Sequence, residues 1–155
     1  MRNFRILFSL LSILFLFSAN AMAIEKIAPD PAAVEVLNGF LAALSTPQEP
    51  AREAAVIPFV HKSLLGKDGK LAPNVKSFSY KKSSNGIQFY KVPAEVTEVH
   101  KGNVLTVGFK ETAEKGRKDK YFINKINPAN GRPAPVIIFF PDGGGSPKIL
   151  DFGSL

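Results

Sequence analysis

The spacing of apolar residues changes about half-way along this chain, and that change limits the folds it can adopt. Between residues 31 and 65 apolar residues recur every three or four positions, as on one side of an α-helix. From about residue 94 they alternate with polar residues, as in half-buried strands. This order predicts an α+β domain, with N-terminal helices packed on one face of a curved antiparallel β-sheet. We expect residues 24–155 to form this single domain.

The first helix has clear start and stop signals. Asp30 followed by Pro31 is typical of an N-cap and first turn, because aspartate accepts free amide hydrogens and proline has none to donate. Thr46-Pro47 ends the helix. The stripe predicted to be buried comprises Ala33, Val34, Leu37, Phe40, Leu41 and Leu44.

The next helical segments are less regular. We expect a second helix over residues 50–65, broken or kinked at Pro58 because proline cannot donate to the carbonyl four residues before it. Val56, Val60 and Leu64 would form its buried side. Residues 74–85 fit either a helix or a strand, and we favour a helix that ends at Asn85-Gly86.

The second half of the chain predicts antiparallel strands. Residues 94–112 indicate a hairpin that turns at Lys101-Gly102, and "KYFINKI" indicates a further strand. "VIIFF" is apolar on both faces, which is typical of a central strand. "KILDF" is expected to be the last strand.

Three glycines, Gly143 to Gly145, separate the last two strands and raise the question of a phosphate-binding loop. Such a loop needs a helix after its glycines, so that backbone amides and the helix dipole face the phosphates. Here Lys148 leads into a strand pattern instead. We therefore predict a hairpin turn, with at least one glycine at positive φ and Lys148 pointing into water.

The N-terminus has the pattern of a secretory signal peptide. Arg2 and Arg5 precede an apolar run, and small residues at Ala21 and Ala23 predict cleavage after Ala23. The alternative is a membrane anchor, but the run of about a dozen apolar residues is short of the ~20 that a spanning helix needs. We expect a periplasmic or secreted protein without a stable membrane anchor. The chain has no cysteine, which excludes disulfides and attachment of lipid to cysteine.

The charge of the mature protein is positive and unevenly distributed. Losing Arg2 and Arg5 lowers the formal net charge from +7 to +5. Residues 101–125 hold seven basic and three acidic residues. A basic face would attract an anionic envelope polymer or lipid head groups, and the alternative is a solvated hairpin. We expect no nucleic-acid partner.

Few groups in the sequence suggest catalysis. His61 and His100 are the only histidines, and without cysteine they provide no metal-ligand spacing, so we expect neither a metal nor a cofactor. His100 is expected to be solvated beside a turn, and His61 to lie on the second helix, more often on its surface than in a pocket. No glycine-flanked nucleophile motif occurs.

The order of elements, closing on "PVIIFFPDGGGSPKILDFGSL", resembles the nuclear transport factor 2-like superfamily, which includes ketosteroid isomerase-like and polyketide cyclase-like proteins. The resemblance covers roughly residues 30–155. It implies a cone, in which a bent sheet wraps around helices and leaves a pocket at its open end. Its isomerase-like members imply a pocket carboxylate helped by a tyrosine or a second acid, for which this chain offers Glu35, Glu95, Glu98, Asp151, Tyr80, Tyr90 and Tyr121.

No pairing of these residues is favoured by spacing, so we assign no catalytic residue. The candidates for lining a ligand pocket are His61, Tyr80, Tyr90, Phe109, Tyr121 and Phe139. The predicted function is an exported, non-catalytic binding or interaction domain, which takes a small apolar ligand or an envelope polymer, or forms a homodimer through its sheet. One alternative is a small proton-transfer enzyme of the isomerase, dehydratase or cyclase type, and another is an inhibitor resembling cystatins.

We predict that export removes residues 1–23. Expression of the whole chain in a bacterial host should yield a mature protein that begins at Ile24, because signal peptidase recognises the small residues at Ala21 and Ala23. N-terminal sequencing of the exported protein measures this directly. A membrane-bound product that keeps Met1 would contradict it.

Overall fold

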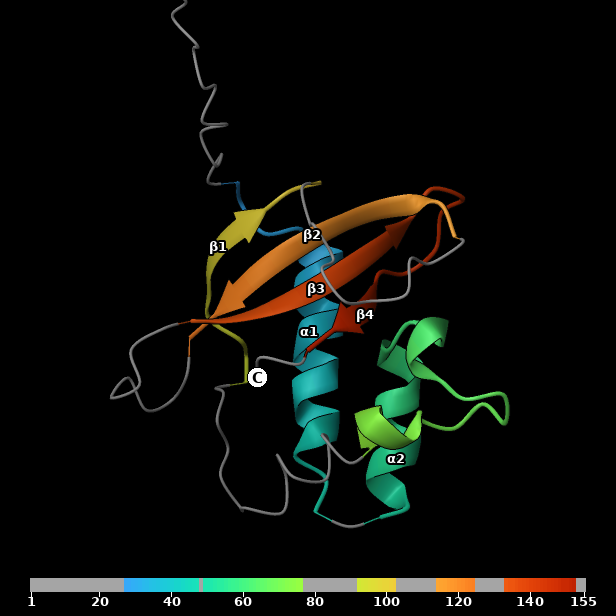
Figure 1. Cartoon of the computed structure of the whole chain (residues 1–155). Coiled ribbons are helices and arrows are strands. Elements are labelled where there is room, and N and C mark those ends of the chain that lie inside the picture. Colours follow the sequence, from blue (N-terminus) through green and yellow to red (C-terminus); the bar gives the residue numbers. More distant parts are fainter. Residues whose placement is uncertain (1–26, 48, 77–91, 103–113, 125–132, 153–155) are drawn as a thin grey trace, which may run out of the picture.

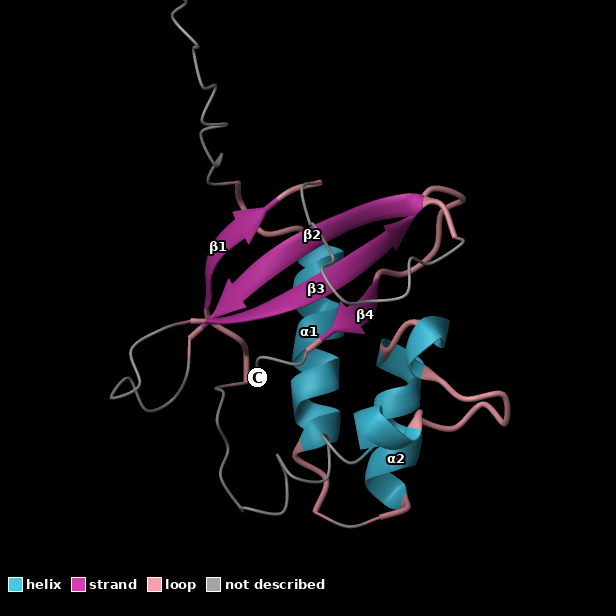
Figure 2. Ribbon diagram, viewed as in Figure 1, coloured by secondary structure: helices cyan, strands magenta, loops and turns pink. Residues whose placement is uncertain are grey.

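The computed structural model describes residues 27–47, 49–76, 92–102, 114–124 and 133–152. The helices come first along the chain and the strands follow, so the α+β class is confirmed (Figures 1 and 2). The predicted signal peptide lies outside the described residues. The elements are α1 (Pro31–Leu44), α2 (Ala51–Val56), two short 3-10 helices η1 (Ile57–Phe59) and η2 (Lys62–Leu64), and the strands β1 (Val96–His100), β2 (Gly116–Ile123), β3 (Ala134–Pro141) and β4 (Lys148–Asp151).

Helix α1 begins and ends as its sequence predicts. The Asp30 carboxylate accepts a hydrogen bond from the Ala32 amide at 2.9 Å, and Pro31 occupies the first turn. The helix ends at Ser45, whose amide donates to carbonyls of the last turn. Its fully buried residues are Ala33, Leu37, Phe40, Leu41 and Ala43, while Val34 and Leu44 are only half-buried.

This buried stripe packs against one face of the sheet, which we call the inner face. The Phe40 ring meets the Phe152 ring edge to face, with centroids 4.9 Å apart. On another side of α1, Gly39 lets the helix approach the Phe59 ring of η1 closely, because a β-carbon at position 39 would collide with that ring. The inner face and α1 therefore form the main hydrophobic core.

The second helical stretch differs from the expected kinked helix over residues 50–65. Helix α2 ends at Val56, and Pro58 lies in the 3-10 turn that follows. Val60 is extended and forms a parallel bridge with Ile149. The amide of the following residue, His61, donates a hydrogen bond to the Ile149 carbonyl at 2.8 Å. Proline removes the amide that would continue the helix, and the chain bonds to β4 instead.

Two buried charges on α2 connect the helix to its surroundings. The Glu53 carboxylate accepts hydrogen bonds from the Leu71 amide at 3.1 Å and the Lys76 ammonium at 2.7 Å. The Lys76 ammonium is the main reason that the pKa of Glu53 is lowered from its ordinary value. Arg52 donates through Nε to Glu49 at 3.3 Å. The bonds to Glu53 offset the desolvation of its carboxylate, and we regard both residues as structural.

The four strands form an antiparallel meander in the order β1-β2-β3-β4. The expected central strand is confirmed, because β3 lies between β2 and β4 and residues 136–139 are all buried. The "KILDF" strand is confirmed as β4. The second strand of the expected hairpin over residues 94–112 and most of the expected helix over residues 74–85 lie outside the described residues.

The glycine segment is a turn, as predicted. It joins antiparallel strands β3 and β4, and Gly144 and Gly145 have φ of 83° and 110°. The Gly144 amide donates to the Pro141 carbonyl at 3.2 Å. One detail of the prediction is wrong: the Lys148 ammonium does not simply point into water, because it donates to the Pro58 carbonyl at 2.6 Å.

The turn yields a stability prediction. Gly144→Ala should lower the free energy of unfolding by about 1–2 kcal/mol, because a β-carbon is strained at positive φ. Gly143→Ala is the matched control, since Gly143 lies in the same turn at a φ outside the positive range and an added β-carbon would meet nothing within 4 Å. Urea unfolding measures both variants. Equal losses of stability would contradict the backbone explanation.

Candidate functional site

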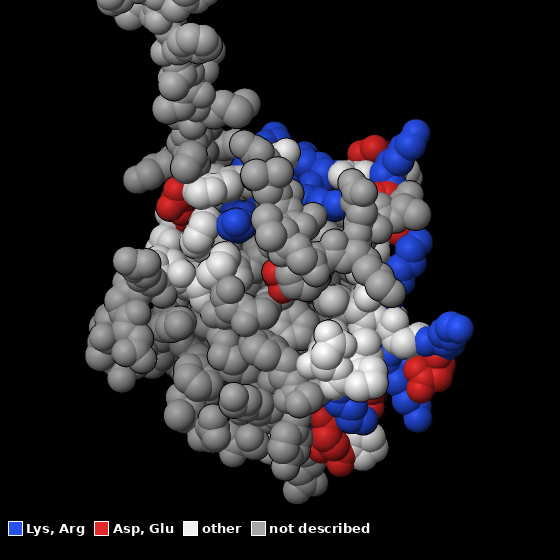
Figure 3. All heavy atoms as spheres, in the orientation of Figure 1, with Lys and Arg blue, Asp and Glu red and all other residues white. Residues whose placement is uncertain are grey.

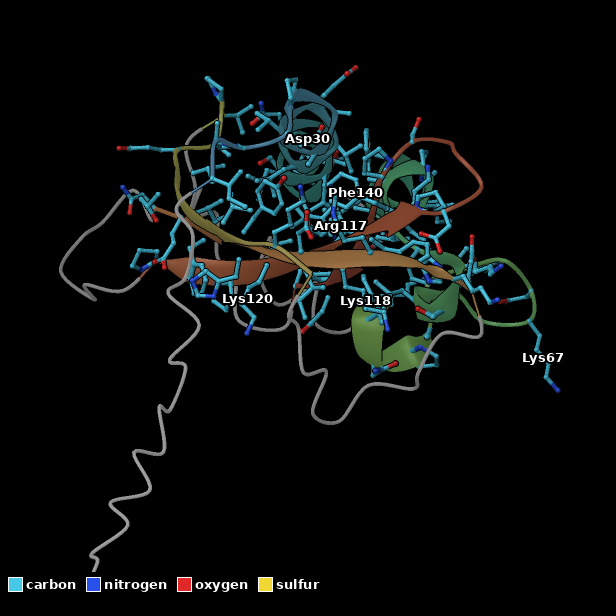
Figure 4. The ribbon with its side chains drawn as sticks, turned by 90° about the horizontal axis from the view of Figure 1, so that it is seen from above. Asp30, Lys67, Arg117, Lys118, Lys120 and Phe140 are labelled. Atoms are coloured by element: carbon cyan, nitrogen blue, oxygen red, sulfur yellow. The ribbon has the colours of Figure 1, made fainter. Side chains whose placement is uncertain are left out.

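Strand β2 places its charged side chains on both faces of the sheet. Arg117, Asp119 and Tyr121 pair with β3 residues that face α1, whereas Lys118 and Lys120 point to the opposite face, which we call the outer face. Figure 4 shows this division, with Arg117 on the side of α1 and both lysines on the other side. Each face therefore has its own candidate site.

The inner-face site is built around Arg117. Its Nε donates to both carboxylate oxygens of Asp119, at 3.0 and 2.9 Å. The Gly102 amide, at the end of β1, also donates to Asp119 at 2.9 Å. The guanidinium carbon lies 4.2 Å from the centre of the Phe140 ring, on the neighbouring strand. Asp119 is 2% exposed, so its charge is buried and satisfied by these donors.

The two terminal amino groups of Arg117 do not take part in the bonds to Asp119. Its side chain is 37% exposed, although its partner Asp119 is almost fully buried. Within the described part of the chain, no residue accepts a hydrogen bond from its two terminal amino groups. We call these two amino groups, held on Asp119 and Phe140, the Arg117 fork.

Tyr121 follows on the same face but has a structural role. It is 1% exposed, and its hydroxyl accepts a hydrogen bond from the Asp30 amide at 3.2 Å. Burial raises the pKa of the Tyr121 hydroxyl, and the negative charge of Asp119 adds to this effect. Tyr121 thus connects the start of α1 to the middle of the sheet and has no access to solvent.

The outer face carries two lysines of β2, Lys118 and Lys120, which we call the basic row, and two more lysines, Lys101 and Lys115, are exposed just after β1 and just before β2. In the described segments, none of these four lysines has an acidic partner. Figure 3 shows basic side chains gathered over the upper part of the sheet. Lys118 and Lys120 of the predicted basic stretch therefore lie on the outer face, whereas Arg117 of the same stretch lies on the inner face (Figure 4).

A third polar group surrounds His61, which is buried and not on a helix surface. Its Nε2 lies 3.2 Å from the Glu114 carboxylate, and its Nδ1 lies 2.8 Å from the Ser63 hydroxyl. Its ring meets the Phe139 ring edge to face, with centroids 4.9 Å apart. Lys62 also donates to Glu114, and this bond is the main reason that the pKa of Glu114 is lowered.

The Ser63, His61 and Glu114 distances resemble a nucleophile, base and acid, an arrangement that the sequence did not indicate. The Ser63 amide, however, also donates to Nδ1 at 3.1 Å, so Nδ1 is an acceptor and the ring proton lies on Nε2. Protonation of Nδ1 would remove the acceptor of that amide. The neighbouring amides of Leu64 and Leu65 already donate to backbone carbonyls. The arrangement caps η2 and supplies no oxyanion hole from these amides.

The sequence-predicted pocket residues do not meet at one place. His61 and Phe139 touch on the outer side, whereas Tyr121 lies on the inner face. Tyr80, Tyr90 and Phe109 lie outside the described residues. Of the candidate acids, Glu35 and Glu95 are exposed, and Asp151 is half-buried on β4.

Glu98 and His100 form a pair on the outer face. Glu98 lies 2.6 Å from His100, and the His100 ring lies 4.8 Å from that of Phe122. His100 is therefore partly covered, which corrects the expectation of a solvated histidine.

Comparisons place no further constraint on the site. No family model, no curated protein and no solved structure matches the chain. Among the described residues, no group of three or more histidine and acidic side chains could hold a metal ion. The described helices are all too short or too polar to cross a membrane.

Sequence reasoning missed Arg117, Asp119, Phe140 and Glu114. One signal was available for the first two, because an arginine and an aspartate two positions apart in a strand share one face. Nothing in the local sequence pairs Arg117 with Phe140 or His61 with Glu114, since these contacts depend on strand register and on chain reversal.

The His61 group yields a pH prediction. Glu114→Gln should destabilise the protein at about pH 7, because it removes charge-assisted bonds to Lys62 and His61. A lowered carboxyl pKa stabilises the fold above the pH range in which unfolded glutamate titrates, and this contribution is lost as the pH falls through the folded pKa. Urea unfolding should therefore show a smaller difference from wild type at about pH 3. Exposed Glu35→Gln is the control, and a Glu114→Gln effect that does not change with pH would refute the charge explanation.

Proposed function

We propose that this protein is an exported, non-catalytic binding domain that holds an anionic polymer of the cell envelope on the outer face of its sheet. The observation that carries the proposal is the basic row. Lys118 and Lys120 project from the same side of one strand without acidic partners among the described residues. Positive side chains fixed on a rigid strand attract a polyanion and hold it in one direction.

The spacing of the row suits a linear polymer. Alternate residues of a strand lie about 7 Å apart, so Lys118 and Lys120 present charges at a regular interval. Lys101 and Lys115 are exposed just after β1 and just before β2, and they add positive charge near the ends of these strands. A polymer with one negative charge per repeat unit would meet several lysines at once, which adds their individually weak attractions.

A lipid surface fits these observations less well. Peripheral membrane binding usually combines basic residues with apolar side chains that enter the bilayer. Val92 is the one exposed large hydrophobic residue of the described segments. Among the described residues, the sheet therefore offers positive charge without exposed apolar side chains for insertion, and we favour a polymer in aqueous surroundings.

The remaining parts of the proposal rest on the sequence. The predicted signal peptide over residues 1–23 supports export. The order of helices and strands, with α1 packed on one face of the sheet, supports a nuclear transport factor 2-like cone.

The test compares two double variants that lose the same charge. Lys118→Gln/Lys120→Gln should bind polygalacturonate and poly(glycerol phosphate) about 30-fold more weakly than wild type, if each lysine contributes about 1 kcal/mol near an anionic surface. Lys67→Gln/Lys70→Gln should keep most of the affinity, because both lysines are exposed in the loop before Leu71 and Lys67 points away from the sheet (Figure 4). Neutral dextran should not bind.

Salt and vesicles provide the remaining controls. Binding of wild type should disappear at about 1 M salt, where the Debye length falls to about 3 Å. Equal losses in both double variants would show that only net charge matters and would refute a defined polymer surface. Binding to anionic vesicles in preference to both polymers would favour a membrane partner instead.

A further inference from the structure

We propose that the Arg117 fork is a binding site for one singly charged oxyanion, a carboxylate or a phosphodiester. The site lies on the inner face of the sheet, whereas the basic row lies on the outer face (Figure 4). This proposal goes beyond polymer binding, because the Arg117 fork would recognise a single charged group by the geometry of its hydrogen bonds and not by the summed charge of several lysines.

Arg117 is held before any ligand arrives. Its Nε is fixed by both oxygens of Asp119, and its guanidinium carbon lies 4.2 Å from the centre of the Phe140 ring. Asp119 is itself fixed, because it is 2% exposed and accepts the Gly102 amide at 2.9 Å. A long arginine side chain normally loses rotamer freedom when it binds a ligand. Here the fold has already removed most of that freedom.

The free part of the guanidinium has the geometry that oxyanions require. Nε is occupied by Asp119, so the edge that remains for a ligand is formed by the two terminal amino groups. Two parallel N–H groups match two oxygens of a carboxylate or a phosphodiester in a bidentate pair. The Arg117 side chain is 37% exposed, so solvent reaches part of it. A lysine at the same position would keep the charge but could not form the pair.

The charge of the site favours a monoanion. Arg117 and Asp119 carry opposite charges at bonding distance, so together they are close to neutral. A dianion, such as inorganic phosphate in mildly alkaline buffer, gains less from a neutral pair than from a free arginine, and Asp119 repels its second charge. A monoanion needs only the hydrogen bonds of the fork. Asp119 is thus a positioning residue that also sets the preferred ligand charge.

The experiment uses the mature chain and small probes of known charge. The buffer is mildly alkaline, so that inorganic phosphate supplies a dianion. Benzoate supplies a carboxylate, benzamide supplies the same shape without charge, and dimethyl phosphate supplies a phosphodiester. Binding is followed by nuclear magnetic resonance at the Arg117 Nε–H and the Gly102 amide, since both donate to Asp119. Benzoate and dimethyl phosphate should shift both signals saturably, and benzamide should not. The monoanion with the lower dissociation constant, benzoate or dimethyl phosphate, shows whether the site prefers a carboxylate or a phosphodiester.

Variants separate the fork from general electrostatics. Arg117→Lys should bind benzoate at least tenfold more weakly, whereas Lys67→Gln should bind it as wild type does. Asp119→Asn, once shown to be folded, should change the preference toward inorganic phosphate, because the site gains one positive charge. Equal binding by wild type and Arg117→Lys, or no saturable shift with any monoanion, would overturn the proposal.

The two proposals fail independently. Loss of the basic row in Lys118→Gln/Lys120→Gln should leave benzoate binding unchanged. Arg117→Lys should leave polymer binding unchanged, because it keeps the charge and lies on the other face. If both properties are lost together in either variant, one shared surface explains them and the separate inner-face site is wrong.

Discussion

The contact between α1 and the inner face of the sheet determines most of this structure. Leu37 and Phe40 are fully buried in it, and the Phe40 ring meets Phe152 just after the last strand. Burial of such side chains is the main favourable contribution to folding. Because the helix covers this face, every second residue of β2 and β3 faces the core, and the residues between them face the other way. The positions of the charged groups follow from that division.

The polar groups on the inner face are arranged around this core. Tyr121 accepts a hydrogen bond from the Asp30 amide, so the first residue before α1 is connected to β2. Asp119 is buried two residues earlier and is satisfied by Arg117 and the Gly102 amide. A buried carboxylate requires such partners, because an unsatisfied charge is costly away from water. The need to satisfy Asp119 is therefore what holds Arg117 in a single position.

Local signals predicted much of the fold. Asp30-Pro31 places the start of α1 correctly, because capping depends on residues within one turn. The two-sided apolar pattern of β3 predicts its central place, and Gly143 to Gly145 predict the turn. The segment after α2 was predicted less well. Pro58 signals a break, but the bond between His61 and Ile149 depends on residues far along the chain and leaves no local pattern.

From the sequence alone one can predict the class of the domain, the limits of α1, the glycine turn and the excess of positive charge in residues 101–125. Each of these depends on neighbouring residues or on composition alone. Three arrangements depend on the three-dimensional fold: Arg117 meets Asp119 and Phe140, His61 is buried beside Glu114, and Lys118 and Lys120 share the outer face. Strand register and the side covered by α1 set these contacts, and a shift of one residue in register would move each side chain to the opposite face.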